Sequence, residues 1–224
     1  MSVPRSPAHD LPLVLPGRFR AAVFDMDGLL LDTEPMWHDA ERELLERHGE
    51  TFTDEDMEAS HGRAVAQTAV AYAERLGLSA GAIEIEIAEI MLAHYLAGAP
   101  LRPGARDLVE ALDGRVALAV ASNTSADLVH QALGAAGLAP LRIVVSGMDM
   151  GRPKPLPDVY AEACRTLGVD PRDAIAFEDS PMGVRSAVDA GLFVVGVPDR
   201  PDVDLGMAGA HVVMATLEGI VVTG

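Results

Sequence analysis

The chain has 224 residues, and its 34 acidic side chains against 17 lysines and arginines give a formal net charge of −17. Such an excess argues against nucleic acid or an anionic membrane surface as the main partner, because like charges repel. The single cysteine, Cys164, excludes an intrachain disulfide. No apolar segment approaches the roughly 20 residues of a membrane helix. We therefore expect a cytoplasmic protein that binds neither nucleic acid nor membrane, and that is a monomer, with a homodimer as the alternative.

In chain order, residues 1–17 are rich in proline and are expected to form a flexible N-terminal tail. A short apolar segment over residues 19–24 follows and stops abruptly at Asp25-Met26-Asp27-Gly28. Comparable segments, rich in Val and Ile, lie at 116–121, 143–145, 174–177, 193–197 and 212–214. They do not alternate between apolar and polar residues, which predicts strands that are covered on both faces.

Segments with helical spacing separate these strands, over about 105–112, 126–136, 158–167 and 181–190. Strand alternating with helix predicts a doubly wound parallel α/β sheet with right-handed crossovers. The first connection is different, because four helical stretches follow one another without a strand, over 36–47, 54–59, 64–76 and 80–96. We therefore predict an all-helical domain, 35–99, inserted into an α/β core formed by residues 18–34 and 100–224.

Polar side chains lie where four of the predicted strands end. They are Asp25 and Asp27 after the first strand, Ser122 and Asn123 after the second, Lys154 beyond the third, and Glu178 and Asp179 after the fourth. Ligands of open parallel sheets bind beyond the carboxyl ends of the strands. Acids, a hydroxyl, an amide and a cation are thus expected to converge on one edge of the sheet.

Each group alone also has an ordinary structural explanation. A pair of aspartates after a strand, Ser-Asn before a helix and Glu-Asp-Ser before a helix are all common in turns and helix caps. Lys154, which would normally be a solvated surface charge, is the only lysine in the chain, since the other basic residues are all arginines. This usage suggests that the position needs a compact ammonium group. Four coincidences at four strand ends are less probable than one active site.

The residue types then indicate the chemistry. Clustered carboxylates without a histidine or cysteine cluster favour a hard cation such as Mg²⁺. Beside such an ion and a lysine, an ionised aspartate can attack phosphorus to give an aspartyl-phosphate. Ser122 and Asn123 are candidates to bind the transferring oxygens. Asp27 is placed to protonate the leaving alcohol and then to activate water.

These four motifs, in this order, resemble the signature of the haloacid dehalogenase-like hydrolase superfamily, and the match extends over almost the whole chain from Arg18. The segment Asp25-Met26-Asp27-Gly28-Leu29-Leu30-Leu31-Asp32-Thr33-Glu34-Pro35 is similar to the branch that contains beta-phosphoglucomutase and small sugar-phosphate phosphatases. In that branch a helical cap is inserted into a Rossmann-like core after the first motif. The resemblance therefore implies the same two-part architecture that the helical insert predicts.

The resemblance also implies roles for the motif residues. Asp25 would be the nucleophile and Asp27 the general acid/base, while Ser122 and Lys154 would bind phosphate. Mg²⁺ would be held by Asp25, the main-chain carbonyl of Asp27, and Asp179. Glu178 would be either a further ligand or a carboxylate outside the coordination of the ion.

Candidates for substrate specificity lie in the predicted cap. His61-Gly62-Arg63 falls between two helices, where related enzymes carry a specificity loop, so that Arg63 could bind an anionic group and His61 a sugar hydroxyl. The alternative is that Gly62 is a turn residue and Arg63 is solvated. Trp37 is either a core anchor of the cap or a wall on which a sugar ring stacks.

Together these features predict a Mg²⁺-dependent phosphatase of small phosphate monoesters, sugar phosphates in particular. A phosphomutase is the alternative. Beta-phosphoglucomutase uses a cap histidine and a cap lysine, whereas Trp37 occupies the position of that histidine here, His38 is about 100° further around the helix, and the cap has no lysine.

Three other classes of protein fit less well. Asp27 argues against a dehalogenase, which works without Mg²⁺ and lacks this second aspartate. The predicted cap, together with an acid/base so close to the nucleophile, argues against a phosphate-accepting signalling module. The complete set of motifs argues against an inactive binding protein.

Overall fold

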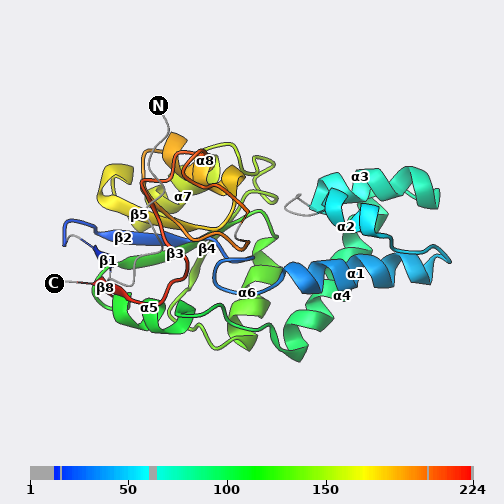
Figure 1. Cartoon of the computed structure of the whole chain (residues 1–224), viewed down its shortest axis with the longest axis horizontal. Helices are drawn as coiled ribbons and strands as arrows, with labels where there is room; N and C mark the ends of the chain where they lie inside the picture. The colour runs from blue at the N-terminus through cyan, green and yellow to red at the C-terminus, as the bar shows by residue number, and fades with distance from the viewer. Residues whose placement is uncertain (1–12, 16, 61–64, 201, 223–224) are drawn as a thin grey trace.

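The computed structural model describes residues 13–15, 17–60, 65–200 and 202–222. Figure 1 shows two parts, a sheet flanked by helices and, beside it, an elongated group of helices that the chain forms early in its course. We call the first part the core and the second part, helices α1–α4, the cap.

The main sheet of the core has six parallel strands in the order β4-β3-β2-β5-β6-β7. The strands are β2 (Ala21–Phe24), β3 (Ala117–Ser122), β4 (Ile143–Ser146), β5 (Ala174–Glu178), β6 (Phe193–Gly196) and β7 (Val212–Val213). Successive side chains of a strand point to opposite faces. In β2, Ala22 and Phe24 accordingly belong to one apolar cluster and Ala21 and Val23 to a second. Burial on both faces explains the unbroken apolar runs and confirms the predicted doubly wound fold.

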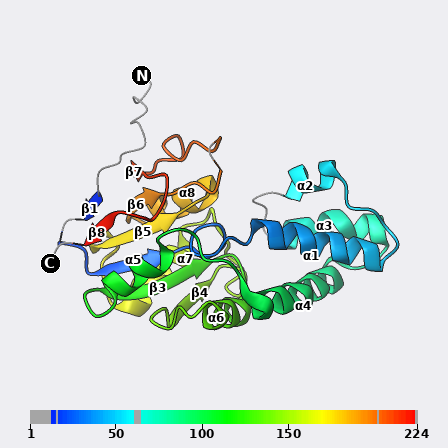
Figure 2. The ribbon, with the colours of Figure 1, turned by 60° about the horizontal axis from the view of Figure 1, so that its bottom comes forward.

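Helices cover both faces of this sheet (Figure 2). They are α5 (Ala105–Leu112), α6 (Ala126–Ala135), α7 (Asp158–Leu167) and α8 (Pro181–Asp189), with a short 3₁₀ turn at η1 (Pro171–Asp173). Leu108 of α5 and Val129 of α6 share the cluster of Phe24, whereas Val159 of α7 and Val184 of α8 share the cluster of Val23. Two hydrophobic layers thus hold the sheet between its helices, one on each face.

A second, two-stranded sheet pairs β1 (Leu13–Leu15) with β8 (Ile220–Val222) in parallel. The predicted N-terminal tail did not anticipate this strand. The strand has only three residues, between two prolines, and so short a segment shows no apolar pattern. It pairs with the last described strand, which is far away in the sequence. Residues 1–12 and 16 of the predicted tail lie outside the described residues.

The cap consists of α1 (Glu34–Arg47), α2 (Asp54–Ser60), α3 (Val65–Leu76) and α4 (Ala80–Gly98). Leu44 of α1, Ala69 of α3 and Ile87 of α4 are buried in its interior. The helix α4 also reaches back to contact α6 of the core. Among the described residues, no helix combines the length and the apolar character needed to cross a membrane.

The two connections between core and cap lie side by side. The main-chain N–H of Asp32 donates to the carbonyl of Pro100 (2.8 Å), and that of Arg102 donates to the carbonyl of Leu30 (2.9 Å). Leu31 and Leu101 form an antiparallel bridge between these bonds. The cap is therefore held to the core by a paired two-stranded hinge.

Candidate active site

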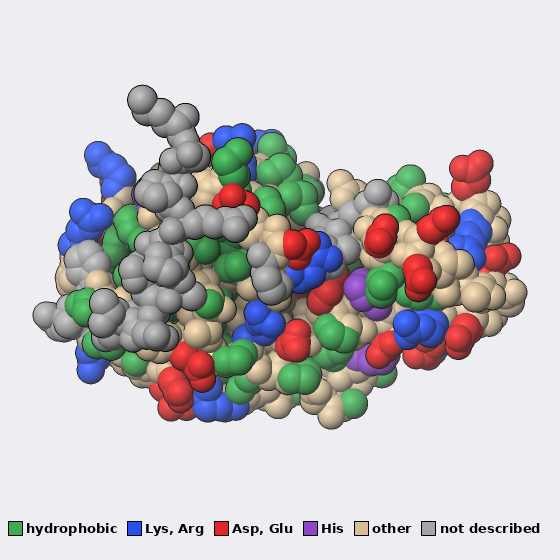
Figure 3. Space-filling model, viewed as in Figure 1, with side chains coloured by type: hydrophobic (Ala, Val, Ile, Leu, Met, Phe, Trp, Pro, Cys, Tyr) green, Lys and Arg blue, Asp and Glu red, His purple; other side chains and the backbone are tan. Residues whose placement is uncertain are grey.

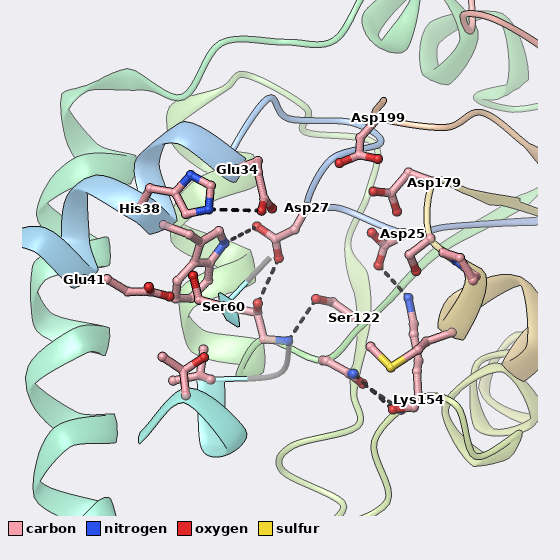
Figure 4. Close-up of a pocket in the computed structure, with 18 of the residues that line it drawn as sticks. Asp25, Asp27, Glu34, His38, Glu41, Ser60, Ser122, Lys154, Asp179 and Asp199 are labelled. Carbon is pink, nitrogen blue, oxygen red and sulfur yellow. Dashed lines mark hydrogen bonds and ion pairs between the residues drawn. The ribbon is translucent and has the colours of Figure 1, made fainter. Parts of the chain in front are cut away.

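A cavity of about 370 Å³ lies between the carboxyl edge of the main sheet and the cap (Figure 4). Asp25 follows β2 directly, Ser122 ends β3, and Glu178 ends β5. Because β2 pairs with both β3 and β5, these three strand ends are neighbours. The sheet therefore brings the predicted motifs of three strands together on one side of the cavity.

Lys154 reaches into this group of carboxylates. Its Nζ donates to Asp25 Oδ1 (2.5 Å) and to Glu178 Oε1 (2.6 Å), and all three side chains are buried. Burial alone would lower the pKa of Lys154, but the two adjacent carboxylates raise it, so the ammonium stays charged. Burial raises the pKa of Asp25 to about 7 despite the opposing effect of Lys154. One cation thus does not fully compensate the negative charge collected here.

Glu178 is held by donors of the protein on both oxygens. Tyr160 donates to Oε1 (2.6 Å) beside Lys154, while Oε2 accepts from the main-chain N–H groups of Asp179 and Ser180 and from the Ser180 hydroxyl. A Cβ added at Gly183, on the first turn of α8, would lie 1.8 Å from Glu178 Oε1. The start of α8 is therefore shaped around this carboxylate, which fixes the position of Lys154.

Asp25, Glu178 and Asp179 form a buried group whose carboxylate oxygens lie within 4.8 Å of one another. Burial, followed by the charge of Asp25, raises the pKa of Asp179 well above its usual value. Gly28 follows the first motif with φ +80°, and a Cβ there would lie 2.2 Å from Asp179 Oδ2. Buried carboxylates with raised pKa values and hard oxygen donors fit a divalent cation. These residues can hold such a metal.

Ser122 and Asn123 lie beside this group but differ in their contacts. The Oδ1 of Asn123 accepts from the main-chain N–H of Lys154 (2.8 Å), and its Nδ2 donates to the carbonyl of Lys154 (3.4 Å). Both polar atoms of this amide therefore fix the Lys154 main chain, which sequence reasoning did not anticipate. The Ser122 Oγ accepts from the main-chain N–H of Thr124 (3.0 Å), and within the part of the chain that the structure describes its own hydrogen has no acceptor.

Asp27 faces the cap. Its carboxylate accepts hydrogen bonds from the side chains of Thr33, Trp37, Tyr95 and Thr124. Trp37 is half-buried and lines the cavity, but its indole N–H meets Asp27, a contact that neither interpretation of this residue from sequence included. Burial and the adjacent Asp27 raise the pKa of Tyr95 well above its usual value, so its phenol remains a donor.

The cap side of the cavity is lined by polar groups: Glu34, His38, Glu41, Ser60 and Thr68. Burial raises the pKa of Glu41 to about 7, although hydrogen bonds oppose this change, and Tyr72 donates to its Oε2 (3.0 Å). His38 lies 3.4 Å from Glu34, Nε2 to Oε1. His38, predicted to lie about 100° further around the helix than Trp37, lines the cavity as well, because the cavity extends around the first turns of α1. Figure 3 shows acidic side chains on the cap and at its junction with the core.

Some functional positions could not be compared with the prediction, and others were missed. His61, Gly62 and Arg63 lie outside the described residues. Sequence reasoning missed four side chains that bind the predicted site residues: Thr33, Tyr95, Thr124 and Tyr160. Both threonines lie in or directly beside the predicted motifs, and this position was a signal that could have identified them. The two tyrosines lie within helices and look like ordinary core positions.

Comparisons with known proteins agree with this geometry. A sequence model of the family described as haloacid dehalogenase-like hydrolase matches residues 19–191. The validoxylamine A 7'-phosphate phosphatase of Streptomyces hygroscopicus subsp. limoneus is 32% identical, over 89% of this chain and 94% of its own. The fructose-1-phosphate phosphatase of Escherichia coli (strain K12) is 30% identical, over 80% and 97%.

A solved structure also has the same fold. The crystal structure of CbbY from Rhodobacter sphaeroides in complex with phosphate superimposes with a TM-score of 0.80 at 27% identity, over 89% of this chain and 95% of its own. Because 89% of this chain is covered, the similarity includes both the core and the cap.

Proposed function

The chain belongs to the haloacid dehalogenase-like hydrolase family, as an enzyme that hydrolyses phosphoric monoesters, and we propose that it is a Mg²⁺-dependent phosphatase of small sugar phosphates. The observation that carries this proposal is the position of Asp25. It stands at the end of the central strand β2, bonded to Lys154, within the carboxylate group that includes Asp179, and two residues before Asp27.

In the first half of the reaction, a carboxylate oxygen of Asp25 attacks phosphorus. The bond between phosphorus and the ester oxygen breaks, and Asp27 gives its proton to that oxygen, so that the alcohol leaves. Lys154 and the Ser122 hydroxyl bind the transferring oxygens. They offset the repulsion between an anionic nucleophile and an anionic phosphate.

In the second half, water attacks the phosphorus of the aspartyl-phosphate and gives a proton to Asp27. The bond from phosphorus to Asp25 breaks, inorganic phosphate leaves, and both carboxyl groups return to their starting states. The sum is ester plus water giving alcohol plus phosphate. Cap residues over the cavity would exclude bulk water from the first half.

We assign Mg²⁺ to Asp25, Asp179 and the main-chain carbonyl of Asp27, where the ion would neutralise the charge on the transferring phosphoryl group. Glu178 already accepts five hydrogen bonds from the protein. This number favours a place for Glu178 outside the coordination of the ion, where it holds Lys154. Asn123 would act in the same indirect way, through the Lys154 main chain.

The cap side of the cavity supports a substrate with several hydroxyl groups. Glu34 and Glu41 offer acceptors, and Ser60 and Thr68 offer hydroxyls that both donate and accept. A sugar or other polyol satisfies such a wall, and a cavity of about 370 Å³ suits a ligand of that size. Two relatives act on phosphorylated compounds of this kind, as their names state.

The test is ³¹P NMR of the enzyme with Mg²⁺ and a panel of sugar phosphates. The panel includes β-glucose 1-phosphate with a trace of the 1,6-bisphosphate. We expect inorganic phosphate as the product, and no turnover by an Asp25→Asn sample purified in parallel, which controls for a contaminating phosphatase. Rapid formation of glucose 6-phosphate with little inorganic phosphate would instead identify a phosphomutase. Equal turnover by the Asp25→Asn sample would overturn the proposal.

A further inference from the structure

The carboxylate of Asp27 has unequal surroundings at its two oxygens. Three donors meet Oδ1, namely Thr33 Oγ1 (2.8 Å), Tyr95 OH (2.9 Å) and Trp37 Nε1 (3.3 Å). Among the described residues, a single side-chain donor, Thr124 Oγ1 (2.8 Å), meets Oδ2. Figure 4 shows Asp27 between the cap residues Glu34 and His38 on one side and Asp25 on the other.

The unequal number of donors determines which oxygen of Asp27 can carry a proton. A carboxylate oxygen has two lone pairs, so three donors leave no room for a hydrogen on Oδ1. Hydroxyl groups can turn and accept a hydrogen bond, but an indole N–H can only donate. A proton on Oδ1 would therefore face the N–H of Trp37 directly. A proton on Oδ2 meets only the hydroxyl of Thr124, which can turn to accept it.

Resting on the proposed role of Asp27 as acid/base, we propose that Oδ2 is the atom that gives and takes the proton, and that Trp37 and Tyr95 are positioning residues that direct it. In the first half of the reaction the proton moves from Oδ2 to the ester oxygen as the bond to phosphorus breaks. In the second half Oδ2 receives a proton from the attacking water. Oδ1 remains bound to its three donors throughout.

The orientation of the Asp27 carboxylate depends on the cap, because two of the donors to Oδ1 are cap residues. Trp37 belongs to α1 and Tyr95 to α4, two separate helices of the cap, whereas Thr124 belongs to the core. The Tyr95 side chain is fully buried, so its hydroxyl has a fixed place. The two cap helices therefore set the direction of a carboxylate that the core strand β2 carries.

A buried phenol always needs an acceptor, so Asp27 could simply satisfy Tyr95 without any effect on catalysis. The dependence on the leaving group separates these roles. Phenyl phosphate and 4-nitrophenyl phosphate have rings of similar size, but only phenolate needs a proton to leave readily, since 4-nitrophenolate is stable as the anion. The value of kcat/KM reports the first half of the reaction, in which that proton is given.

The experiment measures kcat/KM for both esters with the wild type, Trp37→Phe and Tyr95→Phe. We expect about a ten-fold loss for phenyl phosphate and at most about a two-fold loss for 4-nitrophenyl phosphate. Tyr72→Phe is the matched control, because it removes a phenol from the same cap that bonds Glu41 and not Asp27. Its ratio of the two values should equal that of the wild type.

Equal losses for the two esters in both variants would overturn the inference and leave the phosphatase function standing. Turnover that survives Asp25→Asn would overturn the function and the inference together. Because each ratio comes from two esters and one enzyme sample, a partly unfolded preparation does not change it. The side chain of the Asp27→Asn variant cannot give a proton. This variant therefore shows the largest change expected in the ratio of kcat/KM for the two esters, against which the changes in the other variants are compared.

Discussion

The two sides of the cavity are built in opposite ways. On the core side, Lys154, Asp25 and Glu178 are buried and bonded to one another at 2.5 and 2.6 Å. On the cap side, Glu41 and its neighbours are polar groups on helices that meet the core at a hinge. The core side is therefore a buried charge network on the main sheet, whereas the cap side is a polar wall on attached helices whose direct bonds to the first motif are those of Trp37 and Tyr95 to Asp27.

Asp25→Asn should have the largest effect, because an amide cannot form the aspartyl-phosphate. We expect loss of kcat by at least about 10⁴-fold for every phosphate ester tested. Asp27→Asn should slow turnover less and let the phosphoenzyme accumulate, which mass spectrometry of the acid-quenched protein would detect. An Asp25→Asn loss confined to some substrates would show that the core network does not serve all of them alike.

Metal removal should have an effect nearly as large. Activity should vanish after dialysis against a chelator and return with Mg²⁺, whereas Ca²⁺ should inhibit, because its looser coordination misplaces the nucleophile. Asp179→Asn should weaken Mg²⁺ binding, measured by calorimetry, while the exposed control Asp202→Asn should not. Full activity in the metal-free enzyme would contradict the assignment of the carboxylate group.

Lys154→Met tests the rigidity of the core side. Removal of one member of a buried ion pair leaves charge uncompensated, so we expect the free energy of unfolding in chelator to fall by about 3 kcal/mol. Arg152→Met is the matched control, since the Arg152 side chain is exposed and bonds only Asp158 in the part of the chain that the structure describes. Urea titrations of both variants give the comparison, and equal stabilities would refute it.

Glu41→Gln should have the smallest effect and a distinctive pH dependence. The pKa of Glu41 is raised from 4.5 to about 7, so the folded protein binds more protons than the unfolded chain between these values. The associated stability is present below pH 4.5 and lost as the pH rises to 7. Compared with the wild type, the variant should therefore gain about 1–3 kcal/mol on going from pH 5 to pH 8.

Urea titrations at the two pH values measure this gain. The control is Glu43→Gln on the same helix, which breaks a surface ion pair with Arg47 and should show no such trend. A gain of the same size in the control would mean that the net charge of the protein, and not the burial of Glu41, produces it.

The sequence was most informative where structure depends on neighbours along the chain. The helices over 105–112 and 158–167 have the predicted bounds, because their apolar spacing and flanking residues are local signals. The strand ends that carry Asp25, Ser122 and Glu178 were likewise predictable, since each apolar run stops at a polar motif. Convergence at one edge then follows from parallel pairing.

Contacts between distant segments were not predictable in this way. Tyr95 meets Asp27 across 68 positions of sequence, and that contact depends on how the cap rests against the core. The phase of α1 correctly separates Trp37 from His38, yet both reach the cavity, because its wall is wider than one helix position. The partner of β1 lies at the opposite end of the chain, and three residues give no period to read.

The paired hinge has a consequence for how such proteins change over evolution and in the laboratory. Leu31 and Leu101 are bridged, so the two ends of the inserted segment are adjacent. The entropic cost of closing a loop rises only slowly with its length, so a longer or shorter insert would change the stability of the core little through this effect. The bonds of Lys154 to Asp25 and Glu178 involve core residues alone, so a segment of another length between these two leucines would change the groups around Asp27 and α6 and leave that network in place.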